Sequence, residues 1–224
     1  MSLIVIPFKM NSIITKNYCY LVYDSISREA VAIDPAGDAL LLSDAITQHD
    51  LKLKAVLITH THPDHIMLAQ YFMKRYGCWI YVSNKEDLCC FSQIQDKLSL
   101  ISKVTPLHAG QLIVTPIHTP GHTLGSLCYL IGDNLFTGDT LFIEGCGMCF
   151  DQRSDPRQLF SSLNKLKRII PPDTKIYPGH SYGQEPGMDF SYLLANNIYL
   201  HFKDETKFVA FRMRKGQTRL LDFH

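Results

Sequence analysis

The chain has 224 residues, of which 46% are hydrophobic and 19% are charged, and its formal net charge is +1. A chain of this length fills one α/β domain, so we expect a single domain over residues 1–224. The near-neutral charge argues against nucleic-acid binding, and no apolar run approaches the roughly 20 residues of a membrane-spanning helix.

The N-terminal third is predicted to contain strands and one helix. β-Branched and aromatic residues bounded by turns predict strands over Leu3–Lys9, Tyr18–Tyr23, Glu29–Ile33 and Leu53–Thr59. Apolar residues at helical spacing predict an amphipathic helix over Asp38–His49. Residues 1–7 lack a basic leader and a cleavage site, so a first strand explains them better than a secretory signal.

The next segments are predicted to be largely helical. A helix is expected over Asp64–Tyr76, and its apolar face would be formed by Met67, Leu68, Tyr71 and Phe72. A strand over Trp79–Val82 and a polar helical stretch over Lys85–Leu98 follow.

The second half is predicted to be richer in strands. They are expected over Gln111–Ile117, Ser126–Ile131, Asn134–Thr137 and Lys175–Tyr177. Prolines near both ends predict a helix over Asp155–Ile170. The tail from Lys203 is interpreted as a last strand followed by a frayed end.

Four short motifs carry the chemistry. They are Thr59–His65, Thr119–His122, Thr137–Thr140 and Tyr177–His180. Together they offer seven potential metal ligands: His60, His62, Asp64, His65, His122, Asp139 and His180. A site this rich in imidazole and carboxylate favours zinc, iron or manganese over calcium.

The spacing of these residues predicts two metal sites. His60 and His62 are two residues apart at a strand end, so both side chains can reach one ion, which His122 would complete. The second ion would be held by Asp64, His65 and His180. Asp139 is the predicted bridging ligand, because one carboxylate can offer an oxygen to each of two cations. A buried cluster of this kind would be costly without a metal ion.

The remaining histidines and the cysteines are interpreted without a catalytic role. Isolated histidines are more often surface or core residues than ligands; these are His49, His108, His118, His201 and His224. Cys146 and Cys149 form a C-x-x-C without a second ligand pair, so we expect a loop that contains two thiols. Cys89 and Cys90 are expected to be partly buried. Seven cysteines, an odd number without secretory context, fit the cytoplasm.

The order H-x-H-x-D-H, Gly-His, Gly-Asp and Gly-His resembles the metallo-β-lactamase superfamily. The resemblance implies an α/β fold, a four-layer αββα sandwich with a dinuclear site at the edge of two central sheets. It also implies that Asp34 supports the ligands from behind, as an acceptor beside metal-bound imidazoles.

Within the superfamily the segment from Phe136 to Gly147 resembles the glyoxalase II branch, whose members hydrolyse thioesters. Two departures argue against a glutathione thioester. The chain stops before the C-terminal helical domain of glyoxalase II, and Met148 and Phe150 replace a Lys and a Tyr of that branch. A charged tripeptide would therefore find fewer partners here.

Four segments resemble more closely the zinc-dependent hydrolases of trans-acyltransferase polyketide clusters: Gly138–Gly147, Tyr177–Ser181, Asn196–Tyr199 and Phe211–Arg214. This resemblance implies a stand-alone hydrolase of acyl thioesters carried by acyl carrier protein. Basic residues that could form a docking face are Lys165, Lys167, Arg168, Arg212, Arg214 and Lys215.

The expected mechanism uses two divalent metal ions, most simply zinc, to hold a shared hydroxide that attacks the thioester carbonyl, because metal binding lowers the pKa of water to about 7. Asp64 and Tyr182 are the predicted catalytic residues. Tyr182 matches a glyoxalase II Tyr that contacts substrate, and it would donate a hydrogen bond to the substrate unless it only packs on its loop.

Four alternatives remain open. The first is a glyoxalase II-like hydroxyacylglutathione hydrolase. A mononuclear iron persulfide dioxygenase resembles the same motif set, and one iron per chain with oxygen uptake would identify it. A lactonase or another ester hydrolase would have the same centre. A purely structural metal is disfavoured, because a structural zinc site has four protein ligands and these motifs supply seven.

Overall fold

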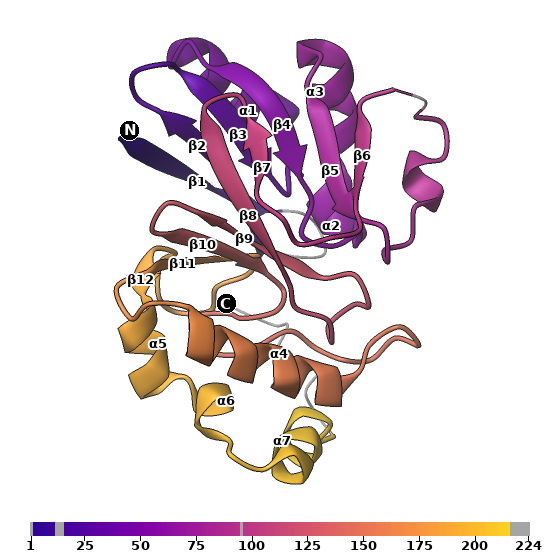
Figure 1. Ribbon diagram of the computed structural model, residues 1–224, viewed down its shortest axis with the longest axis vertical. Coiled ribbons are helices and arrows are strands. Elements are labelled where there is room, and N and C mark those ends of the chain that lie inside the picture. The colour runs from indigo at the N-terminus through magenta and orange to yellow at the C-terminus, as the bar shows by residue number, and fades with distance from the viewer. Residues whose placement is uncertain (1, 12–15, 95, 216–224) are drawn as a thin grey trace.

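The computed structural model describes residues 2–11, 16–94 and 96–215. Two six-stranded sheets dominate this part of the chain. Figure 1 shows them stacked between two groups of helices, with α1 and α3 outside one sheet and α4 to α7 outside the other. The predicted four-layer αββα sandwich is confirmed.

The first sheet has the order β1-β2-β3-β4-β5-β6. Its strands are Leu3–Asn11 (β1), Lys16–Asp24 (β2), Glu29–Ile33 (β3), Lys52–Leu57 (β4), Trp79–Ser83 (β5) and Leu98–Ile101 (β6). From β3 to β6 neighbouring strands run parallel, so their carboxyl ends lie at one edge of the sheet.

The second sheet has the order β12-β11-β10-β9-β8-β7. Its strands are Leu107–Ala109 (β7), Leu112–His118 (β8), Leu127–Ile131 (β9), Asn134–Gly138 (β10), Lys175–Pro178 (β11) and Met188–Asp189 (β12). The neighbours β10 and β11 run parallel, and the motif residues Asp139 and His180 follow directly after their ends.

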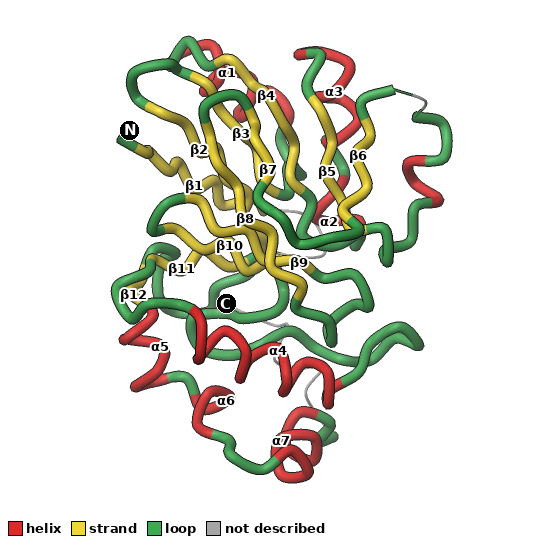
Figure 2. Tube along the Cα trace, in the orientation of Figure 1, coloured by secondary structure: helices red, strands yellow, loops and turns green. Residues whose placement is uncertain are grey.

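The helices flank the sheets, as the red segments of Figure 2 show. They are Ala39–Gln48 (α1), Pro63–Ile66 (α2), Ala69–Tyr76 (α3), Pro156–Ile169 (α4), Phe190–Asn196 (α5), Ile198–His201 (α6) and Glu205–Arg212 (α7). Among the described residues no helix is long and apolar enough to cross a membrane.

Three buried clusters hold the layers together. One lies between the sheets and includes Tyr20, Leu57 and Tyr129. A second joins the first sheet to its helices through residues such as Phe72, and a third joins the second sheet to α4 through residues such as Leu163. Each sheet therefore buries both faces, which stabilises this architecture through apolar contact.

The helix predicted over Asp64–Tyr76 is interrupted. The backbone leaves the helical region at Leu68, whose φ and ψ are −103° and 1°, and its amide donates to the carbonyl of Pro35 at 2.9 Å. Of the predicted apolar face, Leu68 and Phe72 are buried, whereas Met67 and Tyr71 are exposed.

The polar helix predicted over Lys85–Leu98 was wrong. The described part of this segment contains only a short 3₁₀ helix over Cys89–Phe91, and Leu98 begins β6. The segment connects two parallel strands and is held by tertiary contacts rather than by a helical hydrogen-bond ladder. Cys89 and Cys90, expected to be partly buried, are exposed.

The strand predicted after Lys203 is instead α7. Asp204 caps this helix by accepting from the amide of Lys207 at 2.8 Å, and Phe208 is buried against α4 and its neighbours. The spacing of the apolar residues here is compatible with a strand or a helix, and packing against the rest of the protein favours the helix. The frayed end and His224 lie outside the described residues.

Candidate metal centre

The two sheets bring the four motifs to one place. Thr59 and His60 follow β4, Asp139 follows β10, and His180 follows β11, while His122 lies in the loop between β8 and β9. Ends of parallel strands are recurrent sites in α/β proteins because several loops meet there.

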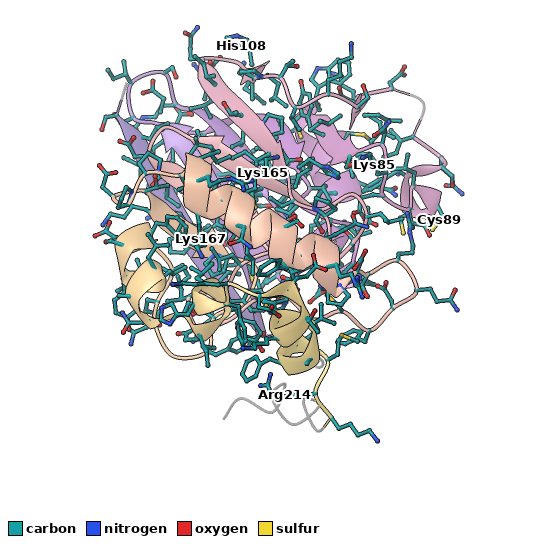
Figure 3. All side chains as sticks on the ribbon, turned by 60° about the horizontal axis from the view of Figure 1, so that its bottom comes forward. Lys85, Cys89, His108, Lys165, Lys167 and Arg214 are labelled. Atoms are coloured by element: carbon teal, nitrogen blue, oxygen red, sulfur yellow. The ribbon has the colours of Figure 1, made fainter. Side chains whose placement is uncertain are left out.

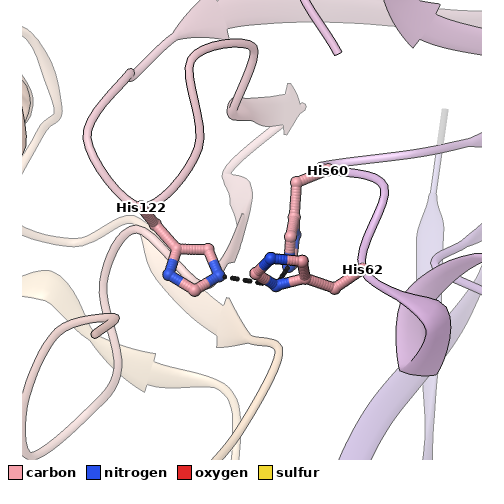
Figure 4. Close-up of side chains that lie close together, drawn as sticks. All are labelled: His60, His62 and His122. Carbon is pink, nitrogen blue, oxygen red and sulfur yellow. Dashed lines mark hydrogen bonds between the residues drawn. The ribbon is translucent and has the colours of Figure 1, made fainter. Parts of the chain in front are cut away.

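The first ligand group consists of His60, His62 and His122. His62 Nδ1 lies 3.1 Å from His60 Nε2 and 3.0 Å from His122 Nε2, and Figure 4 shows the three rings facing one another. Three imidazole nitrogens gathered this closely form one face of a coordination shell, as the spacing predicted.

The second group consists of Asp64, His65 and His180. Asp64 Oδ2 lies 3.6 Å from His180 Nε2 and 3.9 Å from His65 Nε2. Asp64 and His65 lie in α2, which begins with Pro63, so the first turn of this helix presents both side chains to the site.

Asp139 lies between the two groups. Its Oδ1 is 3.5 Å from His65 Nε2, and its Oδ2 is 3.5 Å from His122 Nε2 and 3.4 Å from His180 Nε2. One carboxylate therefore faces ligands of both groups, which is the arrangement that a bridging role requires.

The site passes a test for metal binding. His65 Nε2 and Asp139 Oδ1 are buried, and neither makes a hydrogen bond within the described part of the chain. A buried donor or acceptor that makes no hydrogen bond is costly, and a cation bound by these atoms would remove that cost. The seven side chains thus fit two metal ions.

Acceptors behind the ligands orient the rings. The carboxylate of Asp34 accepts from the amide of Thr59 at 2.7 Å and from Nδ1 of His65 at 2.9 Å, as expected of a supporting residue. Nδ1 of His122 donates to the carbonyl of Met148 at 2.7 Å. The contacts of His65 and His122 each fix Nδ1 and leave Nε2 facing the metal position.

Sequence reasoning missed several of these supports. The Met148 carbonyl is a backbone group, so no side-chain pattern marks it. Asp151 Oδ2 lies 3.5 Å from His62 Nε2, on the side of the ring away from the ligand group. Glu86 is buried and reaches the loops of His60, His62 and His122.

Close approach requires glycine at two positions beside Asp139. A Cβ on Gly147 would lie 1.9 Å from the carbonyl oxygen of Asp139, and one on Gly179 would lie 2.4 Å from Asp139 Oδ1. A side chain at Gly147 would displace the backbone of Asp139, and one at Gly179 would displace its carboxylate. This explains why glycine precedes His180 in its motif.

Burial and charge set the protonation of the metal-free site. Burial by itself would lower the pKa of His65, but the carboxylates of Asp139 and Asp34 outweigh it and raise that pKa to about 9. Burial and the neighbouring imidazole of His65 hold the pKa of His60 well below its usual value. His65 is thus protonated at neutral pH and His60 is not.

Metal binding at pH 7 is therefore expected to release a proton. His65 must lose the proton on Nε2 to become a ligand, and its raised pKa means that this proton is present before binding. Zinc titration calorimetry in buffers of different ionisation enthalpy should report at least one proton released, and affinity should rise with pH up to about 9. An enthalpy that is independent of the buffer would contradict this.

Tyr182 lies beside the second group. Its ring stacks on that of His180 with centroids 6.5 Å apart and contacts Phe142 edge-on. Burial raises the pKa of Tyr182 far above its usual value, so the phenol stays protonated and can donate. Its contact with substrate, like the catalytic role of Asp64, stays a prediction.

The other candidate residues lie outside the two ligand groups. Cys146 and Cys149 are buried in the cluster beside α4, where burial raises the pKa of each thiol to about 12. The ammonium groups of Lys165 and Lys167, labelled on α4 in Figure 3, donate to the carbonyls of His118 and Leu200. Arg212 is buried, so it is unavailable for the predicted docking face.

Comparison with known proteins identifies the family. A family model described as the metallo-beta-lactamase superfamily matches residues 15–88 and 98–180, which hold all seven ligands. The chain belongs to the metallo-β-lactamase superfamily. This confirms the family predicted from the four motifs.

Relatives within the superfamily point to two kinds of hydrolase. The chain is 41% identical over 207 residues to the probable polyketide biosynthesis zinc-dependent hydrolase BaeB of Bacillus velezensis, covering 92% of both chains. It is 34% identical to the hydroxyacylglutathione hydrolase of Shewanella halifaxensis, covering 74% of this chain and 62% of that one.

A solved structure agrees with this fold over nearly the whole chain. The crystal structure of ETHE1 from Myxococcus xanthus superposes with a TM-score of 0.81 at 28% identity, covering 97% of this chain and 95% of that one. The similarity therefore extends past the motifs into the C-terminal helices.

Proposed function

We propose that this protein is a zinc-dependent hydrolase that cleaves acyl thioesters, and that its substrates are acyl groups carried by acyl carrier protein in polyketide biosynthesis. The observation that carries the proposal is the pair of ligand groups that share Asp139. The names of the relatives support zinc and the polyketide context.

The residues of the site would hold the metal ions or orient their ligands. His60, His62 and His122 would hold one ion, Asp64, His65 and His180 the other, and Asp139 would face both. Bound divalent ions supply Lewis acidity and lower the pKa of water to about 7. Asp34 and the Met148 carbonyl keep His65 and His122 in the tautomers that present Nε2 to the site.

A thioester substrate needs no general acid, because its leaving group is a thiolate. A thiol with a pKa of about 8.5 leaves as a thiolate without help, whereas an amine needs an acid. Tyr182 lies beside the second ligand group, and its phenol is too weak an acid to donate a full proton at neutral pH. Its role in the proposal is to donate a hydrogen bond to the substrate.

A cavity beside the centre supports an apolar acyl-thioester arm. It has a volume of about 260 Å³ and is lined by Phe142, Met148, Tyr182 and Tyr199, with Arg214 among its few charged residues. It shares Met148 and Tyr182 with the surroundings of the metal ligands. An arm bound here would therefore reach the reacting position.

Replacing Met148 with lysine, together with Phe150 with tyrosine, is expected to improve acyl-glutathione as a substrate. The double variant restores a cation and a hydroxyl where the glyoxalase II branch carries them, so the glycyl and glutamyl carboxylates gain partners. We expect KM for acyl-glutathione to fall about tenfold, equivalent to about 1.4 kcal/mol. Leu40→Lys, which adds the same charge to an exposed position on α1, is the control. No change in KM would contradict the role of the two positions.

The decisive experiment compares carrier thiols. Zinc-loaded protein is incubated with the same acyl group on pantetheine, glutathione and acyl carrier protein, and thiol release is followed colorimetrically with and without a chelator. The proposal expects chelator-sensitive release that is fastest from acyl carrier protein. Selective cleavage of acyl-glutathione would overturn the substrate, and one iron per chain with oxygen uptake would overturn the reaction.

A further inference from the structure

Glu86 is a buried carboxylate in the loop after β5, with 7% of its surface exposed. Its Oε2 accepts from the amide of Thr61 at 3.1 Å and from the hydroxyl of Thr61 at 2.7 Å. Its Oε1 accepts from the hydroxyl of Thr123. Three donors from two distant loops thus converge on one side chain.

These donors are the immediate neighbours of the first ligand group. Thr61 lies between His60 and His62, and Thr123 follows His122 directly. The loop after β4 and the loop between β8 and β9 belong to different sheets. Glu86 is therefore a link between the two sheets at the point where three imidazoles must meet.

The loop between β8 and β9 approaches Glu86 closely. A Cβ on Gly125 would lie 2.7 Å from both the backbone nitrogen and Cγ of Glu86, so only glycine allows the second loop to approach this far. Ser126 accepts from the amide of Thr123 at 3.1 Å and holds that residue in place.

A third loop is tied to the same segment. Arg153 Nη2 donates to the carbonyl of Lys85 at 2.9 Å, and Arg153 Nη1 lies 3.5 Å from Asp87 Oδ2. The loop that carries Arg153 also carries Asp151, the carboxylate near His62. Residues 85–87 thus contact the loops that carry Thr61, Thr123 and Arg153.

The second group is held by other residues. His65 is oriented by Asp34, and the backbone before His180 is fixed by the amide of Gly179, which donates to the carbonyl of Gly138 at 2.9 Å. Glu86 contacts none of these by any hydrogen bond that links described residues. Its effect should therefore be confined to the first group.

We propose that Glu86 is a positioning residue of the metal centre: it sets the spacing of His60, His62 and His122 and thereby the affinity of the ion that they hold. Burial of a carboxylate is costly unless donors satisfy it, and here all the donors belong to the ligand loops. The proposal goes beyond the hydrolase function, since it holds for any substrate.

The test measures zinc affinity at each group separately. His180→Ala isolates the first group and His122→Ala the second, and dissociation constants are read by competition with a chromophoric chelator. Glu86→Ala is expected to raise the dissociation constant of the first group about 10–100-fold and to leave that of the second unchanged. Cobalt absorption spectra of the first group should change in the same variant.

Conservative variants keep the test valid if Glu86→Ala does not fold. Glu86→Gln keeps the shape and one acceptor oxygen, and Thr61→Val removes a single donor. Both variants should also raise the zinc dissociation constant of the first group, by a smaller factor than Glu86→Ala does. Glu29→Ala is the matched control, because Glu29 also joins two segments, accepting from Gln111 at 2.7 Å, but lies at the far end of β3 from Asp34.

The outcomes separate this inference from the proposed function. The role of Glu86 would be overturned if Glu86→Ala lowered the zinc affinity of both groups equally or left that of the first group unchanged. It would also be overturned if Glu29→Ala had the same effect. A parent protein that binds no zinc would instead overturn the proposed hydrolase. A parent that binds two zinc ions while Glu86→Ala leaves both affinities unchanged overturns only the positioning role.

Discussion

Replacing Asp139 with alanine is expected to reduce thioester hydrolysis at least 100-fold and zinc content from two ions per chain to one or none. Asp139 is the carboxylate that faces His65, His122 and His180. Without its negative charge, less of the repulsion between two cations in neighbouring ligand groups would be compensated. A loss of about 3 kcal/mol of transition-state stabilisation corresponds to about a 100-fold lower rate.

Metal analysis and thiol release of the same preparation check this result. Asp139→Asn keeps the size of the side chain and one oxygen but removes the charge, so it should retain some zinc and remain slow. Asp133→Ala is the control, because Asp133 is an exposed carboxylate just before β10, whereas Asp139 follows that strand. A fully active Asp139→Ala protein with two zinc ions would refute the shared-ligand geometry.

Replacing Asp34 with alanine is expected to destabilise the metal-free protein by about 3–5 kcal/mol, the usual cost of removing one partner from a buried ion pair. The side chains of Asp34 and His65 are both almost fully buried, and their contact is 2.9 Å. Thr59 loses an acceptor as well. Urea unfolding in the presence of a chelator measures this difference without a contribution from bound metal.

The loss of stability in Asp34→Ala is expected to depend on pH. The pKa of His65 is raised to about 9 in the folded protein, against 6.5 for an unperturbed histidine. The stability that this shift contributes is complete below pH 6.5 and is lost as the pH rises through about 9. The cost of Asp34→Ala should therefore be larger at pH 6.5 than at pH 9.5.

Two variants separate charge from backbone strain. Asp34 has a positive φ of 48°, a region that asparagine tolerates better than alanine, so Asp34→Asn should cost less than Asp34→Ala. Asp50 has a similar φ of 51° but is exposed, so Asp50→Ala reports the strain alone. Equal losses for Asp34→Ala and Asp50→Ala would show that the buried ion pair contributes nothing.

The elements that the sequence predicted well are those with a strong local pattern. The strands from Glu29 to Ile33 and from Ser126 to Thr137 carry short apolar runs between turns, and the helix after Asp155 has a cap and a proline at its start. Local interactions suffice for such segments. The helix predicted from Lys85 and the strand predicted from Lys203 failed because their patterns were ambiguous and packing decided them.

The seven candidate ligands stood out in the sequence because metal chemistry is carried by residue type and by short spacing. His60, His62, Asp64 and His65 lie within six residues, and Asp139 and His180 each follow a glycine at a strand end. The spacing also indicated that His60 and His62 approach one position and that Asp64 and His65 approach another, which agrees with the two groups in the structure.

What only the tertiary structure decided is how those ligands are held. The carboxylate of Glu86 meets Thr61 and Thr123, which are 25 and 37 residues away in the chain, and the Met148 carbonyl meets His122 from 26 residues away. Nothing in a local pattern specifies such contacts, because they exist only once two sheets have packed against each other. The sequence by itself determined which atoms can bind metal; the packing of the sheets determined the distances between them.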